Sequence, residues 1–330
     1  MTTLGCTKRR GLLAATAAFL GAPLGRAFAA GDIAGGKPIT LVVSYPAGGG
    51  ADVMARLIAP RLAESLGQPV IVENKPGASG TIAAAQVARA APDGSTLLVD
   101  ASSFAVNPSL FDKLPYDTAT GFAPLAVLAL YPNALVCTPS FEARSVADVL
   151  RLARARPGAL AYASSGNGSA QHLAGALFEA MAKVDMAHVP YRGGGPALND
   201  VMGGQVPLFF ANVASSLGHI QSGRLRALAV TSKLRSRVLP DLPSLDEVGL
   251  KGYEVLEWNP VLAPAGVAAS VRARLAAATR KAMADPEVLA RVRALGGEVF
   301  GGGEAEAATF LKAQQALWSQ VVRERRITRE

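Results

Sequence analysis

The chain has 330 residues, of which half are hydrophobic and 18% are charged. This composition excludes a disordered protein, and the length is typical of about two domains with large hydrophobic cores. The net charge is +8, but no dense basic run with interleaved aromatic residues follows the N-terminal segment. A nucleic-acid partner is therefore not expected.

The N-terminal segment has the three parts of a cleavable export signal. Lys8, Arg9 and Arg10 form a basic region, residues 11–20 are uncharged and mostly apolar, and residues 27–29 give a small-x-small cleavage site. The apolar run is too short to span about 30 Å of hydrocarbon as a helix, which argues against a retained anchor. We predict a signal peptide over residues 1–29 and a periplasmic mature protein. The paired arginines are also compatible with the twin-arginine export route.

The reactive side chains form no recognisable catalytic or metal-binding pattern. Cys137 is the only cysteine after residue 29, so no internal disulfide is possible, and its apolar neighbours predict a buried thiol. The three histidines match no zinc-binding motif, and the turn at Ser79 lacks the final glycine of a nucleophile elbow. His188 is predicted to pack in a strand rather than to act as a base. We therefore predict no catalytic residue, no metal and no cofactor.

Strand-like and helical patterns alternate along the first part of the mature chain. Short apolar runs predict strands at residues 40–44, 69–72 and 95–99, and helical spacing of apolar side chains predicts helices at 51–66 and 80–91. This βαβαβ order is typical of a parallel sheet with helices on both faces.

The alternation begins again after residue 130. Further strands are expected at residues 135–138, 160–163, 187–189, 206–210, 226–231 and 256–264. Further helices are expected at residues 145–155, 169–181, 195–203, 268–284, 286–295 and 304–324. We predict two α/β domains, one formed by residues 30–131 and 254–330 and the other by residues 132–253. Two chain crossings between them would allow hinge motion around a central cleft.

The first of three glycine-rich loops stands between the strand at 40–44 and the helix at 51–66. It contains Tyr45, Pro46, Ala47, Gly48 and Gly49. Glycines let backbone N–H groups approach a ligand, and the start of the following helix favours an anion. The spacing matches neither the dinucleotide fingerprint nor the phosphate-binding loop. A tight turn without a ligand is the alternative.

The second and third loops follow strands of the other predicted domain. The second loop contains Ser164, Ser165, Gly166, Asn167, Gly168 and Ser169, with His172 in the following helix. Its side chains are small hydrogen-bond donors, and Ser169 also fits the N-cap of the helix. The third loop begins with Tyr191 and Arg192, whose guanidinium can bind a carboxylate with two parallel hydrogen bonds. A surface arginine beside a flexible turn is an equal alternative.

Together with shorter motifs, these loops resemble the substrate-binding proteins of tripartite tricarboxylate transporters, the Bug or TctC family. The matching stretches lie at residues 43–52, 72–80, 92–98, 166–173, 189–193, 223–232 and 262–266. Each stretch alone is weak, but the ordered set covers nearly the whole mature chain.

The resemblance implies a two-domain periplasmic binding protein of type II-like fold, each domain a mainly parallel sheet flanked by helices. It also implies that a small carboxylate binds between the domains. One carboxylate would contact residues 164–169, the loop at 46–50 would hold the distal part through water, and Ser102 and Ser103 would complete the wall. The partners implied are the integral-membrane permease subunits of a tripartite transporter, with the receptor acting as a monomer.

One position departs from the pattern of this family. Many relatives have an aspartate directly after the strand that ends here at Phe209 and Phe210, whereas this chain has Ala211 followed by Asn212. Loss of that carboxylate favours a ligand without a free ammonium group. We predict an aliphatic or aromatic carboxylate that is captured for transport. A periplasmic sensor that signals to a membrane receptor is the first alternative, and a secreted α/β hydrolase is the second.

Overall fold

The computed structural model describes residues 33–325 and 327–328. The predicted signal peptide lies outside the described residues. The strands are β1 (Ile39–Val43), β2 (Val70–Asn74), β3 (Thr96–Val99), β4 (Phe122–Cys137), β5 (Ala161–Ser164), β6 (Ala187–Pro190), β7 (Leu208–Asn212), β8 (Arg226–Val230), β9 (Leu256–Pro264) and β10 (Glu298–Val299).

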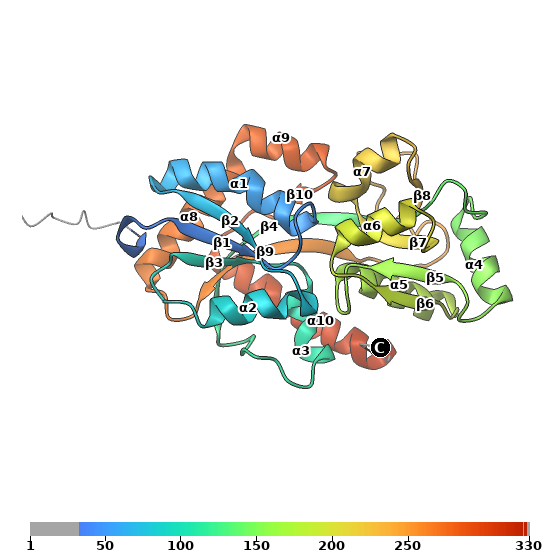
Figure 1. Cartoon of the computed structure of the whole chain (residues 1–330), viewed down its shortest axis with the longest axis horizontal. Coiled ribbons are helices and arrows are strands. Elements are labelled where there is room, and N and C mark those ends of the chain that lie inside the picture. The colour runs from blue at the N-terminus through green and yellow to red at the C-terminus, as the bar shows by residue number, and fades with distance from the viewer. Residues whose placement is uncertain (1–32, 326, 329–330) are drawn as a thin grey trace, which may run out of the picture. The chain divides into compact units, whose positions relative to one another are not determined.

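The helices cover both faces of the sheet formed by these strands (Figure 1). They are α1 (Gly50–Leu66), α2 (Thr81–Ala88), α3 (Ser103–Leu110), α4 (Val146–Ala155), α5 (Ala170–Ala182), α6 (Gly194–Met202), α7 (Val213–Gln221), α8 (Ala269–Ala284), α9 (Pro286–Ala294) and α10 (Glu304–Arg325). Two short 3₁₀ turns, Ile33–Gly36 and Ala78–Gly80, complete the described elements.

The strands lie in the order β2-β1-β3-β9-β4-β7-β5-β6, and β8 and β10 pair with β4. The pairs β1–β2, β1–β3, β5–β6 and β5–β7 are parallel, as expected for strands joined by crossover helices. All pairings of β4, and the pairing of β3 with β9, are antiparallel. Strand β4 pairs with β9 over its first two thirds and with β7 and β8 over its last five residues, so it runs through both halves of the sheet.

Alternating side chains on each strand fill separate cores on the two faces of the sheet. On β1, Leu41 and Val43 pack with α1, α8 and α9, whereas Val42 packs with α2, α3 and α10. On β4, Leu135 and Cys137 pack with α4 and α5. The neighbouring Ala134 and Val136 pack with α6 and α7. The predicted α/β fold with parallel strands and helices on both faces is confirmed.

Helix α10 contributes to two of these cores. Ala307 and Leu311 lie in the core that contains Val42 of β1 and side chains of α2 and α3. Trp318 and Val322 lie in the core formed by α4 and α5. The C-terminal helix therefore joins the two halves of the sheet in addition to the strands β4 and β9. Cys137 is fully buried, which confirms the predicted core thiol, and burial raises its pKa.

Several elements, including the two-residue strand β10, were not predicted from the sequence. The first half of β4 contains Pro124 and is largely buried, so it shows no alternation of polar and apolar residues. Helix α3 contains Pro108, and α7 has two adjacent serines in its first turn that are typical of a loop. Asn212 caps α7 by accepting a hydrogen bond from the Ala214 N–H at 2.8 Å.

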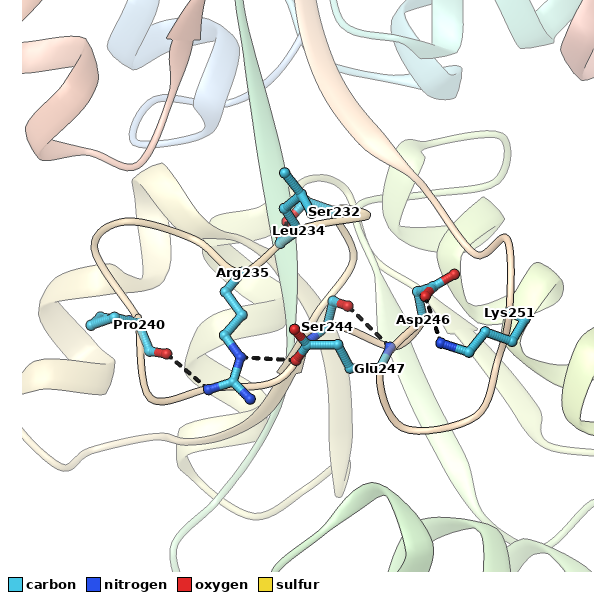
Figure 2. A network of polar contacts seen from close by, with 8 residues as sticks. All are labelled: Ser232, Leu234, Arg235, Pro240, Ser244, Asp246, Glu247 and Lys251. Atoms are coloured by element: carbon cyan, nitrogen blue, oxygen red, sulfur yellow. Dashed lines mark hydrogen bonds and ion pairs between the residues drawn. The ribbon is translucent and has the colours of Figure 1, made fainter.

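The connector between β8 and β9 is held by polar contacts among its own residues (Figure 2). Arg235 Nε contacts Glu247 Oε2 at 2.8 Å, and its Nη1 donates to the Pro240 carbonyl at 3.2 Å. Lys251 Nζ contacts Asp246 Oδ2 at 3.0 Å. This long loop is therefore an ordered part of the fold. Within the residues that the structure describes, no helix is both long and apolar enough to cross a membrane.

Candidate ligand-binding site

Four loops at the carboxyl ends of parallel strands surround one cavity of about 290 Å³. Tyr45 and Pro46 follow β1, Ser165 follows β5, and Tyr191 follows β6. The remaining lining residues are Gly77, Ala78, Ser79, Gly80, Phe111, Gly166, Asn167, Pro190 and Arg192. Because the carboxyl ends of the strands in an open α/β sheet are the usual place for ligands, this cavity is the candidate site.

Asp52, in the first turn of α1, anchors the loop after β1. Its carboxylate accepts hydrogen bonds from the Gly48 N–H at 2.9 Å and from Arg56 Nε at 3.0 Å. Asn74 Nδ2 donates both to Asp52 Oδ1 and to the Tyr45 carbonyl, each at 2.9 Å. Burial alone would raise the pKa of Asp52, but the hydrogen bonds from Arg56, Gly48 and Asn74 outweigh it and lower the pKa. The ionised carboxylate thus fixes the loop beside the cavity.

The loop after β5 is closed by hydrogen bonds within itself. The Gly166 N–H donates to Ser164 Oγ at 3.0 Å, and the Gly168 N–H donates to His172 Nδ1 at 3.0 Å. Ser169 caps α5 by accepting from the His172 N–H at 3.2 Å. Gly166 and Gly168 have φ values of 121° and 77°, which L-residues with a side chain rarely adopt. The amides of these two glycines therefore serve the loop, and they are not free for a ligand in this arrangement.

His172 and His188 support this loop from behind. Their rings stack with centroids 4.0 Å apart, and His188 Nε2 lies 2.6 Å from Ser164 Oγ. Burial lowers the pKa of His172 to about 4, and burial together with His172 lowers the pKa of His188 to about 3. Both rings are neutral at physiological pH. The prediction that His188 packs within the structure agrees with its stacked position.

The loops after β1 and β6 touch each other across the cavity. A Cβ placed on Gly193 would lie 2.5 Å from Pro46 Cδ, so only glycine fits there. Tyr191 donates a hydrogen bond through its hydroxyl to Asp200 Oδ2 at 2.8 Å, which fixes its ring at the wall. The exposed Arg192 lines the cavity and forms no ion pair with any residue that the structure describes.

The loop after β2 was not predicted as part of the site. Ser79 lines the cavity with a φ of +55°, and its hydroxyl donates to the Asn167 carbonyl of the loop after β5. Its own carbonyl accepts from Asn107 Nδ2 at 2.9 Å. The signal in the sequence was the pair Gly77 and Gly80 after a strand, the same strand-to-helix pattern as in the first loop.

A small side pocket of about 30 Å³ shares Tyr45 and Ser165 with the main cavity. Its other lining residues are Gly49, Gly50, Ala51, Ala101, Gln171, Gly194, Phe209, Asn212, Ser215 and Glu257. Glu257, in β9, is only 4% exposed and accepts a hydrogen bond from Gln171 Nε2 at 3.1 Å. Burial raises its pKa to about 7. Sequence reasoning missed Glu257, although a charged residue within an apolar strand is itself unusual.

The structure brings about half of the predicted site residues to these two cavities. Those that line a cavity are Tyr45, Pro46, Gly49, Ser165, Gly166, Asn167, Tyr191, Arg192 and Asn212. Those that do not are Ala47, Gly48, Ser102, Ser103, Ser164, Gly168, Ser169, His172 and Ala211. Several of the second group hold the loops in place, and Ser103 accepts a hydrogen bond from the Tyr45 hydroxyl at 3.0 Å.

Comparison with known proteins places the chain in a family. Residues 54–327 match the model of the tripartite tricarboxylate transporter family receptor, TctC. The chain belongs to this receptor family. A relative described as the UPF0065 protein in the tcbD-tcbE intergenic region of Pseudomonas sp. (strain P51) is 39% identical over 292 residues, which is 88% of this chain and 87% of that protein. The resemblance stated from the motifs is thereby confirmed.

Two similar solved structures contain a ligand. A Rhodopseudomonas palustris protein with adipate has a TM-score of 0.86 and 36% identity, over 88% of this chain and 98% of that one. MatC from the same organism, with bound malate, has a TM-score of 0.83 and 32% identity, over 87% of this chain and 99% of that one. The periplasmic binding protein BugD has a TM-score of 0.85 and 33% identity, over 88% of this chain and 98% of that one, which confirms the predicted fold of a periplasmic binding protein.

Proposed function

We propose that this receptor captures a small carboxylate in the 290 Å³ cavity and delivers it to the permease of a tripartite transporter. The observation that carries the proposal is the convergence of four strand-end loops, from both halves of the sheet, on one cavity that holds an exposed arginine. A cavity at the lower end of the usual range of about 300–1,000 Å³ suits a small solute. Adipate and malate in the similar structures support a carboxylate as that solute.

Arg192 supplies the charged group that would bind the carboxylate, and the starts of two helices supply further hydrogen-bond donors to the ligand. The guanidinium offers paired donors to a carboxylate. The N–H groups in the first turn of α1 and of α6 have no partner within their helix, and both helix starts line the side pocket. The main cavity and the side pocket meet at Tyr45 and Ser165, so one ligand can reach both.

We further propose that residues 30–131 and 254–330 form one lobe and residues 132–253 the other. The lobes would close over the ligand by bending where β4 and β9 connect them. The contact of Pro46 with Gly193 and the hydrogen bond from Ser79 to Asn167 join loops of the two lobes. These contacts would break on opening, so the described arrangement corresponds to the closed form. A permease can distinguish the ligand-bound receptor only if the surface of the closed form differs from that of the open form.

The receptor is proposed to work as a periplasmic monomer without catalytic activity. Ser164 Oγ and His188 Nε2 lie at the distance of a nucleophile and its base, but they share no other property of such a pair. Ser164 is fully buried and lines neither cavity, and the low pKa of His188 makes it a weak base. A hydrolase would need this serine to reach its substrate.

Calorimetric titration with a panel of mono- and dicarboxylates tests the proposal. We expect at least one carboxylate to bind, and Arg192→Ala to weaken that ligand by about tenfold or more, since a charge-assisted hydrogen bond contributes about 1.5–3 kcal/mol. Arg224→Ala, which removes an exposed arginine outside both cavities, is the matched control. Absence of binding across the panel, or an equal loss in both variants, would contradict the proposal.

A further inference from the structure

The side pocket contains a buried donor that has no partner. Asn212 is 5% exposed, and its Nδ2 has no hydrogen-bond partner within the residues that the structure describes. Its Oδ1 accepts from the Ala214 N–H at 2.8 Å, which fixes the amide orientation and leaves Nδ2 toward the pocket. A Cβ placed on Gly50 would lie 3.0 Å from this nitrogen, so the amide faces the start of α1, another source of donors.

Glu257, which also lines this pocket, carries a hydrogen-bond acceptor. Gln171 Nε2 donates to its Oε2 at 3.1 Å and also to Asn133 Oδ1 at 3.1 Å. This bridge holds Glu257 in place between β9 and α5. A carboxyl group accepts hydrogen bonds in either protonation state. The pocket therefore combines an unused donor, Asn212 Nδ2, with an acceptor.

We infer that the side pocket holds a hydroxyl group of the ligand, which accepts a hydrogen bond from Asn212 Nδ2 and donates one to Glu257. The inference rests on the proposed function and narrows its ligand to a hydroxy-substituted carboxylic acid. The carboxylate lies in the main cavity with Arg192, and the hydroxyl enters the side pocket past Tyr45 and Ser165.

Other small groups fit the pocket less well. A volume of about 30 Å³ admits a group of about the size of water. A carboxylate has three heavy atoms and would also lie against Glu257. An ammonium group only donates, so it would leave Asn212 Nδ2 without a partner. A methyl group would leave Asn212 Nδ2 unsatisfied, and an unsatisfied buried group costs about 1–3 kcal/mol.

The test compares ligands that differ only in one substituent. Each set contains an acid and its 2-hydroxy and 2-amino derivatives: succinate with malate and aspartate, adipate with its two derivatives, and phenylacetate with mandelate and phenylglycine. Titration calorimetry gives a dissociation constant for each member. In the set that binds, we expect the hydroxy acid to bind at least about tenfold more tightly than both other members.

Two variants remove one side of the pocket each. In Glu257→Gln, one oxygen remains to accept from Gln171 or from the Ser102 N–H, and an NH₂ group replaces the other oxygen. In Asn212→Asp, one oxygen keeps the cap on the Ala214 N–H, and the other replaces the unpartnered donor. Glu254→Gln is the matched control, because Glu254 is exposed and lines a separate groove of about 940 Å³. Thermal melts establish that each variant is folded.

The outcomes separate this inference from the proposed function. The inference is supported if the preference for the hydroxy acid over the parent acid falls below about threefold in Glu257→Gln or Asn212→Asp. The same preference must persist in Glu254→Gln. If a carboxylate binds but its hydroxy form is no tighter, or if the amino form is tightest, the inference is overturned and the proposed function stands. If no member of any set binds, the proposed function fails as well.

Discussion

The hydroxyl of Ser79 donates a hydrogen bond to the backbone carbonyl of Asn167. Ser79 follows β2 and Asn167 follows β5, so this contact joins loops from the two halves of the sheet. Ser79 also has a φ of +55°, in the left-handed region that costs a residue with a side chain about 1–2 kcal/mol. A strained residue is thus placed at the contact between the two halves, which under the proposed lobe closure forms only in the closed arrangement.

Replacing Ser79 by glycine should separate stability from ligand affinity. Glycine adopts a positive φ without strain, so Ser79→Gly should leave the melting temperature unchanged or raise it slightly. The same change removes the hydrogen bond between the loops after β2 and β5. Under the proposed closure, ligand affinity should fall by about two- to tenfold, the effect of a neutral hydrogen bond. Calorimetry and thermal melts measure the two effects.

The comparison variant is Ser79→Ala, which lacks the hydroxyl but keeps the strain. It should lose the same affinity, and its melting temperature should not exceed that of the wild type. Equal affinity of wild type and both variants would show that the Ser79–Asn167 contact does not contribute to closure.

The buried Glu257 predicts a dependence of stability on pH. Burial, with a smaller contribution from Asp100, raises its pKa from the ordinary value of 4.5 to about 7. The folded protein therefore holds this proton more tightly than the unfolded chain does. Its favourable contribution is complete below pH 4.5 and is lost as pH rises through about 7, an effect of about 3 kcal/mol.

Glu257→Gln removes this titration. The stability of the variant relative to wild type should increase by up to about 3 kcal/mol between pH 4.5 and pH 7.5, because only the wild type loses a bound proton there. Urea denaturation at several pH values gives the difference, in which most other titrating groups cancel. A difference that stays constant with pH, as expected for the exposed Glu254→Gln, would show that the Glu257 carboxyl ionises freely in the folded protein.

The loops could be predicted from the sequence because glycines cluster between a predicted strand and a predicted helix. Gly48 and Gly193 stand where an apolar strand gives way to a helix, and that order predicts a strand-end loop at the ligand-binding edge of a sheet. The parallel strands and most helices followed from the same alternation. What the sequence could not give was the direction in which each loop residue points, since this depends on contacts with residues far along the chain.

His172 and Glu257 illustrate that limit in opposite ways. His172 was predicted as a ligand contact because it follows a glycine-rich loop, yet its Nδ1 accepts the Gly168 N–H and its ring stacks on His188. Glu257 stands in a strand with no motif around it, and its position at the side pocket depends on the pairing of β9 with β4 and on Gln171 from α5. Neither the stacking of His172 on His188 nor the contact of Glu257 with Gln171 can be predicted from the spacing of neighbouring residues in the sequence.

Gly193 provides the sharpest test of closure. Its φ is 117°, and a Cβ added there would lie 2.5 Å from Pro46 Cδ, so alanine at this position would both strain the backbone and push the two loops apart. Gly204 is the matched control: its φ is also positive, at 74°, but a Cβ there would have no neighbour within 4 Å. Gly204→Ala should lose about 1–2 kcal/mol of stability from its positive φ. Gly193→Ala should lose about 1–3 kcal/mol, because its φ of 117° and ψ of 169° lie in a region that is essentially restricted to glycine.

Only Gly193→Ala should also lose ligand affinity, by about tenfold or more, because a collision with Pro46 opposes the closed form. Gly204→Ala should bind the ligand as the wild type does. Small-angle scattering with saturating ligand should show Gly193→Ala to be less compact than Gly204→Ala. If the two variants bind equally, then Pro46 and Gly193 do not need to meet for capture. The loops after β1 and β6 would then have to hold the ligand from a distance, through water, rather than by closing directly over it.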